Sequence, residues 1–251
     1  RTLDLERRPW WHRRSLEGKP QIVSHLRKVR EEYSRIPTQS DRQLRELIAN
    51  YYGMISLIDH NVGHILLHLE QLGLAKDTLV VYSTDHGDWL GDHGLVLKGP
   101  MAYEGLLRVG LIFSGPGIPK EKVVQDPVST VDLAATFADY AAIEIPAARH
   151  SRSLKELIET NSASRDFAYS EWDLRASRSG VDLDLRTVRT LTHKLTLDLR
   201  SGAGELYDLV NDPHEMENCF GFDLPVEKEL VAMIRSRQAD IVPRLPQVGM
   251  A

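Results

Sequence analysis

The sequence predicts an α/β fold: a mixed, largely parallel sheet flanked by helices, followed by a small C-terminal subdomain with an antiparallel sheet plus a helix. Three observations lead to this prediction. A long apolar pattern at helical spacing, residues 44–69, leads into a short β-branched run, Leu79–Tyr82. A second apolar run, Val109–Phe113, ends in a turn rich in glycine and proline. After Asp166 the pattern changes to short alternating segments.

The composition of the chain narrows the classes of partner. Its 251 residues, 42% of them hydrophobic, suffice for one large domain with a small appendage. The net charge of −5 comes without a long basic tract, so we expect no nucleic-acid partner. No apolar run approaches the roughly 18 to 20 residues that span a bilayer, so we expect no membrane partner. The single cysteine, Cys219, excludes an intramolecular disulfide framework, whereas a homo-oligomer and the compartment stay open.

The first part of the chain, residues 1–40, alternates arginine-rich patches with tryptophans and prolines. This pattern indicates an extended segment with one short amphipathic helix near Ile22–Tyr33. The first residues carry neither an initiator methionine nor the apolar core of a signal peptide. We therefore expect the natural beginning of the protein to lie upstream.

A helix of about thirty residues follows, with Ser40 or Asp41 as its N-cap and Gly73 as its C-cap. It leads into the strand Leu79–Tyr82, whose apolar, β-branched residues suit a strand buried on both faces. A helix that leads into a buried strand is half of a βαβ unit, so a parallel or mixed sheet is expected.

After the second strand, Val109–Phe113, the chain predicts a helix through residues 131–141, capped by Ser129 or Thr130. Residues 144–165 are read as an irregular connection around one short helix.

The C-terminal region predicts four short strands and a final helix, with a glycine-rich turn before the last strand. The strands are Phe167–Trp172, Leu185–Leu191, Lys194–Leu199 and Glu205–Leu209, and the helix is Glu227–Ile241. The change of pattern places a boundary near residue 165. It divides the chain into an α/β part, residues 1–165, and a C-terminal α+β subdomain, residues 166–251.

The polar segment Ser83–Asp88 follows the first strand, where loops of open α/β sheets line a ligand crevice. Asp85 and His86 together suit a divalent cation, Ca²⁺ or Mg²⁺ with Mn²⁺ also acceptable, and Gly87 allows the loop conformation that brings both to one side. On local sequence alone, a helix-capping Asp85 and a hydrogen-bonded His86 explain the same residues.

Lys98 lies thirteen residues after Asp85, across a loop with two glycines. Its ammonium could reach back to an anionic substrate beside the metal, although a surface lysine is the ordinary reading. A second polar set in this loop is explained equally well by loop hydrogen bonds: Asp88, Asp92 and His93.

Two other groups of polar residues are assigned structural roles. Glu104 and Arg108 stand four apart in the order that favours a helical ion pair. On the long helix, packing explains three residues better than metal binding does: Asp59, His60 and His64.

Taken together, four blocks of the sequence resemble the sulfatase family of the alkaline phosphatase superfamily. The blocks, in order, are YYGMISLIDHNVGHILLHLEQLGLAKDTLVVYSTDHGDWLGDHGLVLKG, YEGLLRVGLIFSGPGI, VSTVDLAATFADYA and GELYDLVNDPHEMEN. The resemblance covers Leu44 to Asn218 and implies an alkaline phosphatase-like α/β fold. It also implies hydrolysis of a small anionic ester, either a sulfate or a phosphonate or phosphate ester.

The resemblance also implies roles for three residues. In that family an Asp followed by His or Asn at this strand end binds the active-site divalent metal, usually Ca²⁺, and Asp85 and His86 match. A lysine a dozen or so residues later contacts the transferred sulfate or phosphate group, and Lys98 matches.

The chain departs from the family in what it lacks. The family's nucleophile is a formylglycine made from Cys or Ser in a C/S-x-P/A-x-R motif, whereas Cys219 lies in NCFGF. The early aspartate pair that completes the metal site is missing too. The chain thus resembles the C-terminal half only, and we expect the formylglycine to lie outside this chain and the fragment to be inactive alone. Two alternatives stay open: a phosphonate monoester or phosphodiester hydrolase, and a non-catalytic scaffold module.

Overall fold

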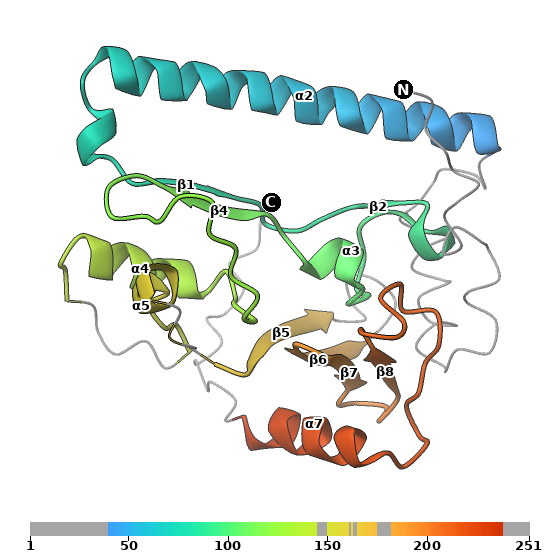
Figure 1. The fold of residues 1–251 in the computed structure, drawn as a ribbon. Helices are drawn as coiled ribbons and strands as arrows, with labels where there is room; N and C mark the ends of the chain where they lie inside the picture. The colour runs from blue at the N-terminus through green and yellow to red at the C-terminus, as the bar shows by residue number, and fades with distance from the viewer. Residues whose placement is uncertain (1–39, 145–149, 161, 163–164, 175–181, 238–251) are drawn as a thin grey trace, which may run out of the picture.

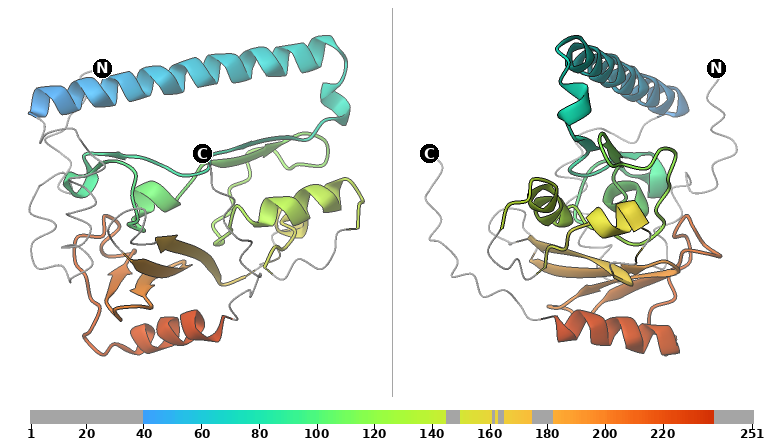
Figure 2. Two further views of the ribbon diagram at one scale, coloured as in Figure 1. Left: turned by 180° about the vertical axis from the view of Figure 1, so that it is seen from behind. Right: turned by 60° about the vertical axis from the view of Figure 1, so that its left-hand side comes forward.

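The computed structural model describes residues 40–144, 150–160, 162, 165–174 and 182–237. The helix expected near Ile22–Tyr33 lies outside the described residues. A long helix, α2 (Asp41–Gln71), runs along one side of the molecule, and a shorter one, α7 (Pro225–Ser236), lies on the opposite side. The strands lie between them in both the front and the back view (Figures 1 and 2).

The ends of α2 confirm the predicted caps. The Ser40 hydroxyl accepts from the Gln43 amide, and the Gln43 side chain accepts from the Ser40 amide, which forms a capping box. At the other end Gly73 adopts a φ of 69°. Its amide donates to Glu70 O and the Leu74 amide donates to Leu69 O, so the helix ends in a Schellman motif.

In the described part of the chain, the buried side chains of α2 lie near its beginning. Leu44 and Ile48 are buried against the partly buried side chains of Leu90 and Val96. Further along, large apolar side chains of α2 are exposed: Tyr52, Met54, Ile55, Leu57, Ile58, Ile65, Leu66 and Leu67. Asp59, His60 and His64, for which packing was expected, are also exposed. Within the described ranges, no helix combines the length and apolarity needed to cross a membrane.

The two predicted α/β strands pair directly with each other. β1 (Val80–Ser83) runs antiparallel to β4 (Leu111–Ser114), with Val80 opposite Ser114. The expectation that β1 is buried on both faces is wrong here, because Tyr82 is exposed and the other three residues are only partly buried. Every strand pair among the described residues is antiparallel, so the largely parallel pairing that the sequence predicted is not found in this part of the chain.

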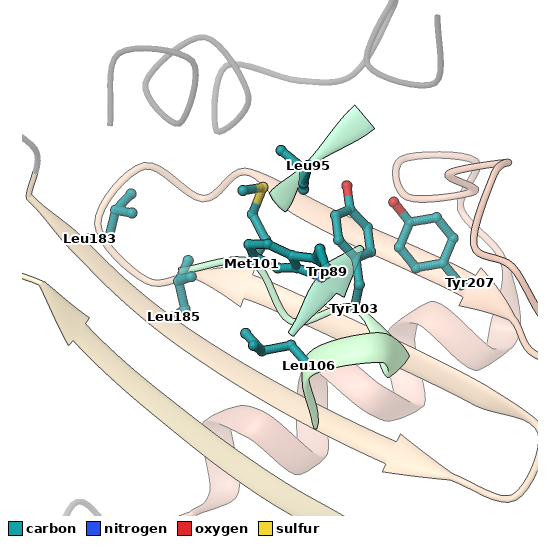
Figure 3. Close-up of a cluster of buried hydrophobic side chains, with 8 residues drawn as sticks. All are labelled: Trp89, Leu95, Met101, Tyr103, Leu106, Leu183, Leu185 and Tyr207. Atoms are coloured by element: carbon teal, nitrogen blue, oxygen red, sulfur yellow. The ribbon is translucent and has the colours of Figure 1, made fainter. Parts of the chain in front are cut away.

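A small hairpin between these strands was not predicted. It consists of β2 (Trp89–Leu90) and β3 (Val96–Leu97), and a four-residue helix, α3 (Glu104–Leu107), follows it. Figure 3 shows the core under this segment, in which Trp89, Leu95, Met101, Tyr103 and Leu106 pack with side chains of the C-terminal sheet: Leu183, Leu185 and Tyr207. The segment from Trp89 to Leu106 therefore shares a hydrophobic core with the C-terminal sheet.

Two helices pack beside β4, namely α4 (Asp132–Tyr140) and α5 (Lys155–Thr160). The prediction that Ser129 or Thr130 caps α4 is wrong. Instead the Asp132 carboxylate reaches back to accept from the Ser129 amide, because the preceding residues already form a tight turn. Asp132 is fully buried and is paired with Arg165.

The C-terminal sheet confirms the four predicted strands, in the order β5-β6-β7-β8. They are β5 (Phe167–Leu174), β6 (Leu183–Thr190), β7 (His193–Asp198) and β8 (Gly204–Asp208). α7 covers one face through Leu230 and Ile234, and it begins at Pro225, two residues before the predicted start. It ends at Ser236, so the predicted extension to Ile241 is not seen in the described part of the chain. The division near residue 165 stays a prediction.

Candidate functional site

Of the predicted site residues, Asp85 and His86 closely follow β1, and Lys98 follows β3. Gly87 anchors the loop after β1, because its amide donates to the Leu106 carbonyl of α3 at 2.8 Å. A Cβ added to Gly87 would lie 2.0 Å from the Gly105 carbonyl oxygen, which is far inside van der Waals contact. Only glycine allows the loop to approach α3 this closely. This contact fixes the position of the loop that carries Asp85 and His86.

This close contact leads to a first prediction. We expect Gly87→Ala to lower the free energy of unfolding by about 1–3 kcal/mol, because the new methyl group forces backbone apart. A matched control is Gly53→Ala in α2, where nothing lies within 4 Å of the added Cβ. That change should stabilise the chain by about 0.5–1 kcal/mol, since alanine favours a helix interior. Urea unfolding of both variants measures the difference, and equal effects would refute the assigned contact.

The hydrogen bonds of His86 determine its tautomer. Its Nδ1 lies 2.8 Å from the Gly87 carbonyl oxygen, which can only accept, so Nδ1 carries the proton. Nε2 then holds a lone pair, and the Lys98 ammonium donates to it at 2.8 Å. The structure thus brings Lys98 back to His86, whereas its predicted contact with an anionic substrate stays a prediction. A neutral imidazole with a free Nε2 lone pair is also the form that binds metal ions.

Asp85 completes the group. Its Oδ1 accepts from the His86 amide at 2.9 Å, and its Oδ2 lies 3.5 Å from His86 Nε2. The bond from the His86 amide lowers the pKa of Asp85 below its usual value, and the charge of Lys98 acts in the same direction. The side chain is 87% exposed, so the carboxylate is ionised at neutral pH and faces solvent.

The donors present fit part of a metal site. Two ligands at right angles around Ca²⁺, each about 2.4 Å from the ion, would be about 3.4 Å apart. The 3.5 Å between Asp85 Oδ2 and His86 Nε2 matches this spacing. Ca²⁺ takes about 6–8 oxygen ligands, however, and the part of the chain that the structure describes holds no group of three His, Cys, Asp or Glu residues able to bind a metal. Further ligands would have to come from elsewhere.

The predicted ion pair of Glu104 with Arg108 is wrong. α3 ends at Leu107, and the Glu104 carboxylate is directed to the C-terminal sheet rather than to Arg108. Glu104 instead lies 3.4 Å from Arg189 and 3.6 Å from Lys194, both on the C-terminal sheet. A role for Glu215, whose carboxylate accepts from the Glu104 amide, was not predicted from the sequence. Its position in the block GELYDLVNDPHEMEN is the one signal that pointed to it.

Two residues of the second polar set, His93 and Asp88, have contacts that fit a structural role. His93 is 3% exposed and its ring stacks on Tyr103 at 3.9 Å. Burial raises the pKa of Tyr51 on α2, and the nearby Asp88 carboxylate raises it further, which shows that the loop touches α2.

A pocket of about 300 Å³ lies away from these residues, between β7 and α7, and is lined in part by Leu197, Phe220 and Val231.

Comparison with known proteins gives two family models that match the chain. One, described as Sulfatase, matches residues 21–143, and the other, described as N-sulphoglucosamine sulphohydrolase, C-terminal, matches residues 91–241. An arylsulfatase of Clostridium perfringens is 35% identical over 182 residues, 70% of this chain. An N-acetylglucosamine-6-O-sulfatase of Bacteroides thetaiotaomicron is 31% identical over 202 residues, 77% of this chain. The chain spans 36% of the length of each of these relatives.

Solved structures support the same fold. A 2-O GAG sulfatase superposes with a TM-score of 0.69 at 30% identity, covering 79% of this chain and 43% of that one. The phosphonate monoester hydrolase of Agrobacterium radiobacter superposes with a TM-score of 0.67 at 26% identity, covering 78% of this chain and 42% of that one. The predicted α/β fold, with its C-terminal antiparallel sheet plus helix, is confirmed.

Proposed function

This chain belongs to the sulfatase family, and on that premise we propose that it forms the C-terminal part of a hydrolase of sulfate esters. The observation that carries the proposal is the convergence of three residues at the end of β1. Asp85 and His86 present a carboxylate oxygen and an imidazole nitrogen 3.5 Å apart, and the Lys98 ammonium stands 2.8 Å from that nitrogen. This arrangement pairs a partial cation site with a group that can bind an anion.

Each of the three residues has a distinct role in the proposed reaction. Asp85 and His86 hold a divalent cation, Ca²⁺ in the first instance with Mg²⁺ or Mn²⁺ as alternatives, through Oδ2 and Nε2. The chemistry that a bound cation would supply is Lewis acidity toward the ester and a lower pKa of the nucleophile. Lys98 donates to the same Nε2 that would bind a cation, so with that nitrogen ligated the Lys98 ammonium would be available to the sulfate oxygens.

The nucleophile, a formylglycine, is proposed to lie outside this chain. No cysteine or serine of the 251 residues stands in a C/S-x-P/A-x-R motif. The apolar side chains exposed on several sides of α2 support the same view, because large exposed apolar surface is ordinarily covered by another part of a domain. By itself the chain is expected to be inactive.

The substrate class is proposed to be a small anionic ester. A related sulfatase structure, 27% identical with a TM-score of 0.68, is a complex with D-glucosamine-2-N,6-O-disulfate. A sulfated sugar is therefore the first class to test. The likeness to a phosphonate monoester hydrolase favours a second candidate, hydrolysis of phosphonate monoesters, since the same three side chains suit a phosphonyl group.

The test compares two substrates on the complete enzyme, which joins this chain to the nucleophile-bearing half. We expect turnover of an aryl sulfate to exceed that of an aryl phosphonate monoester, and Lys98→Met to lower kcat/KM for the sulfate by about 10²-fold, because an ammonium facing the transferred group is lost. The matched control is Lys76→Met, an 81% exposed lysine in the turn before β1, which should leave the rate unchanged.

Three results would count against the proposal. Faster turnover of the phosphonate would select the second candidate function. Equal rates for Lys98→Met and Lys76→Met would remove Lys98 from the site. Hydrolysis of neither ester would favour the non-catalytic scaffold module.

A further inference from the structure

The block GELYDLVNDPHEMEN ends in a turn after β8 that buries a carboxylate. Glu215 is 2% exposed and adopts a φ of 58°, a left-handed conformation that is uncommon for residues other than glycine. Asp212 shapes the turn, since its carbonyl accepts from the Glu215 amide and its carboxylate accepts from the Glu217 amide. The proposed reaction makes no use of Glu215, so its burial needs another explanation.

The Glu215 carboxylate points at the beginning of α3. Its Oε2 accepts from the Glu104 amide at 2.7 Å, and Glu104 is the first residue of that helix. The residue before it, Tyr103, makes no side-chain cap of its own. Glu215 therefore supplies, from 111 residues away, the acceptor that a serine or aspartate supplies in an ordinary helix cap.

The charge of Glu215 is matched inside the core. It forms an ion pair with Lys194 of β7, which is 1% exposed. Lys194 also lies 3.6 Å from the Glu104 carboxylate, which in turn lies 3.4 Å from Arg189 of β6. Two carboxylates and two basic side chains thus join the start of α3 to the C-terminal sheet.

The other end of α3 contacts the loop that carries Asp85 and His86 of the candidate site. The Leu106 carbonyl accepts from the Gly87 amide, and the Gly87 carbonyl accepts from His86 Nδ1, each at 2.8 Å. The second of these bonds determines which nitrogen of His86 keeps its lone pair. A continuous series of contacts therefore runs from Glu215 through α3 to the proposed metal ligand.

We propose that Glu215 is a positioning residue: by capping α3 it holds the Leu106 carbonyl where Gly87 needs it, and so orients His86 beside Asp85. The consequence for the reaction rests on the proposed function, whereas the effect on the loop does not. The C-terminal sheet, on this proposal, sets the geometry of the site without contributing a side chain to it.

Two double variants isolate the cap from the ion pair. Lys194→Met with Glu215→Leu removes both, and it should fold because replacing a buried ion pair by apolar side chains is often neutral. Lys194→Met with Glu215→Gln removes the ion pair but keeps a carbonyl oxygen for the Glu104 amide. The two proteins therefore differ chiefly in that one acceptor. Glu217→Gln, an exposed glutamate in the same turn, serves as the control.

The first readout is amide hydrogen exchange of the full chain. We expect the Gly87 amide to exchange at least about 10-fold faster in the leucine variant than in the glutamine variant, because an opening of α3 releases it. Amides of the β6–β7 ladder, such as Val188 and Leu195, should exchange equally in both. Equal Gly87 rates in the two variants would overturn the proposal.

The second readout is turnover of the complete enzyme. A lower kcat in the leucine variant, with wild-type rates in Glu217→Gln, is the expected result. Faster Gly87 exchange with unchanged kcat would overturn the claim that the cap orients the site. If the wild-type enzyme hydrolyses no ester, the proposed function fails, while the exchange experiment still decides whether Glu215 holds the loop.

Discussion

Replacing Asp85 by asparagine in the complete enzyme is expected to lower kcat/KM for a sulfate ester by about 10²- to 10³-fold. The substitution keeps the shape of the side chain and removes the negative charge that a divalent cation requires. The loss should be largest at low Ca²⁺ and should shrink as Ca²⁺ is raised, because the variant binds the ion more weakly. Rates measured across a Ca²⁺ titration test both statements.

The stability of this variant separates chemistry from folding. The Asp85 side chain is 87% exposed, so its replacement should leave the urea midpoint almost unchanged. Asp77→Asn, which alters a 74% exposed carboxylate in the turn before β1, is the matched control and should retain full activity. Wild-type kcat/KM for Asp85→Asn at all Ca²⁺ concentrations would exclude Asp85 as a metal ligand.

The second large effect concerns the buried ion pair. Lys194→Met is expected to lower the free energy of unfolding by about 3–5 kcal/mol, because it leaves the Glu215 carboxylate buried without its basic partner. The exposed pair of Lys228 with Asp223, 67% and 83% exposed, provides the comparison. Lys228→Met should cost no more than about 1 kcal/mol. Chemical unfolding at neutral pH measures both losses of stability. Equal losses would show that the buried pair contributes no more to stability than the exposed pair does.

The loss in Lys194→Met should depend on pH with a definite sign. Burial raises the pKa of Glu215, and Lys194 opposes that rise, so removing the lysine raises the pKa further. A carboxyl whose pKa is higher in the folded chain binds more protons there, and stability then falls as pH increases from the unfolded pKa to the folded pKa. The variant should therefore be closest to wild type in mild acid and weakest at neutral pH. A loss that grew toward acid pH would contradict this assignment.

Much of the fold follows from local rules that the sequence displays. The 3.6-residue period and the residues around Ser40 and Gly73 predict α2 with both of its caps, because these hydrogen bonds lie within a few residues of each other. The alternating pattern predicts the four C-terminal strands in the same way. The candidate site was also predicted locally, since Asp85, His86 and Lys98 lie close together in the sequence, on either side of the β2–β3 hairpin.

The predictions that the structure contradicts also share a cause. Four-residue spacing suggested an ion pair within a helix for Glu104, but α3 is too short to contain Arg108. A β-branched run suggested burial on both faces for β1, but burial depends on what covers a strand. Ser129 had the right chemistry for a cap, yet its hydroxyl caps no helix amide, and its own amide donates to the Asp132 carboxylate.

The sequence by itself predicted most of the elements, the family and the three residues proposed for the site. Only the tertiary structure showed that Lys98 donates to His86 Nε2, that Gly87 is held by Leu106, and that Glu215 caps α3. The physical reason is the distance along the chain over which each interaction acts. Helix periods, caps and turns join residues a few positions apart, whereas the acceptor for the Glu104 amide is 111 residues away and is brought there by the packing of the sheet.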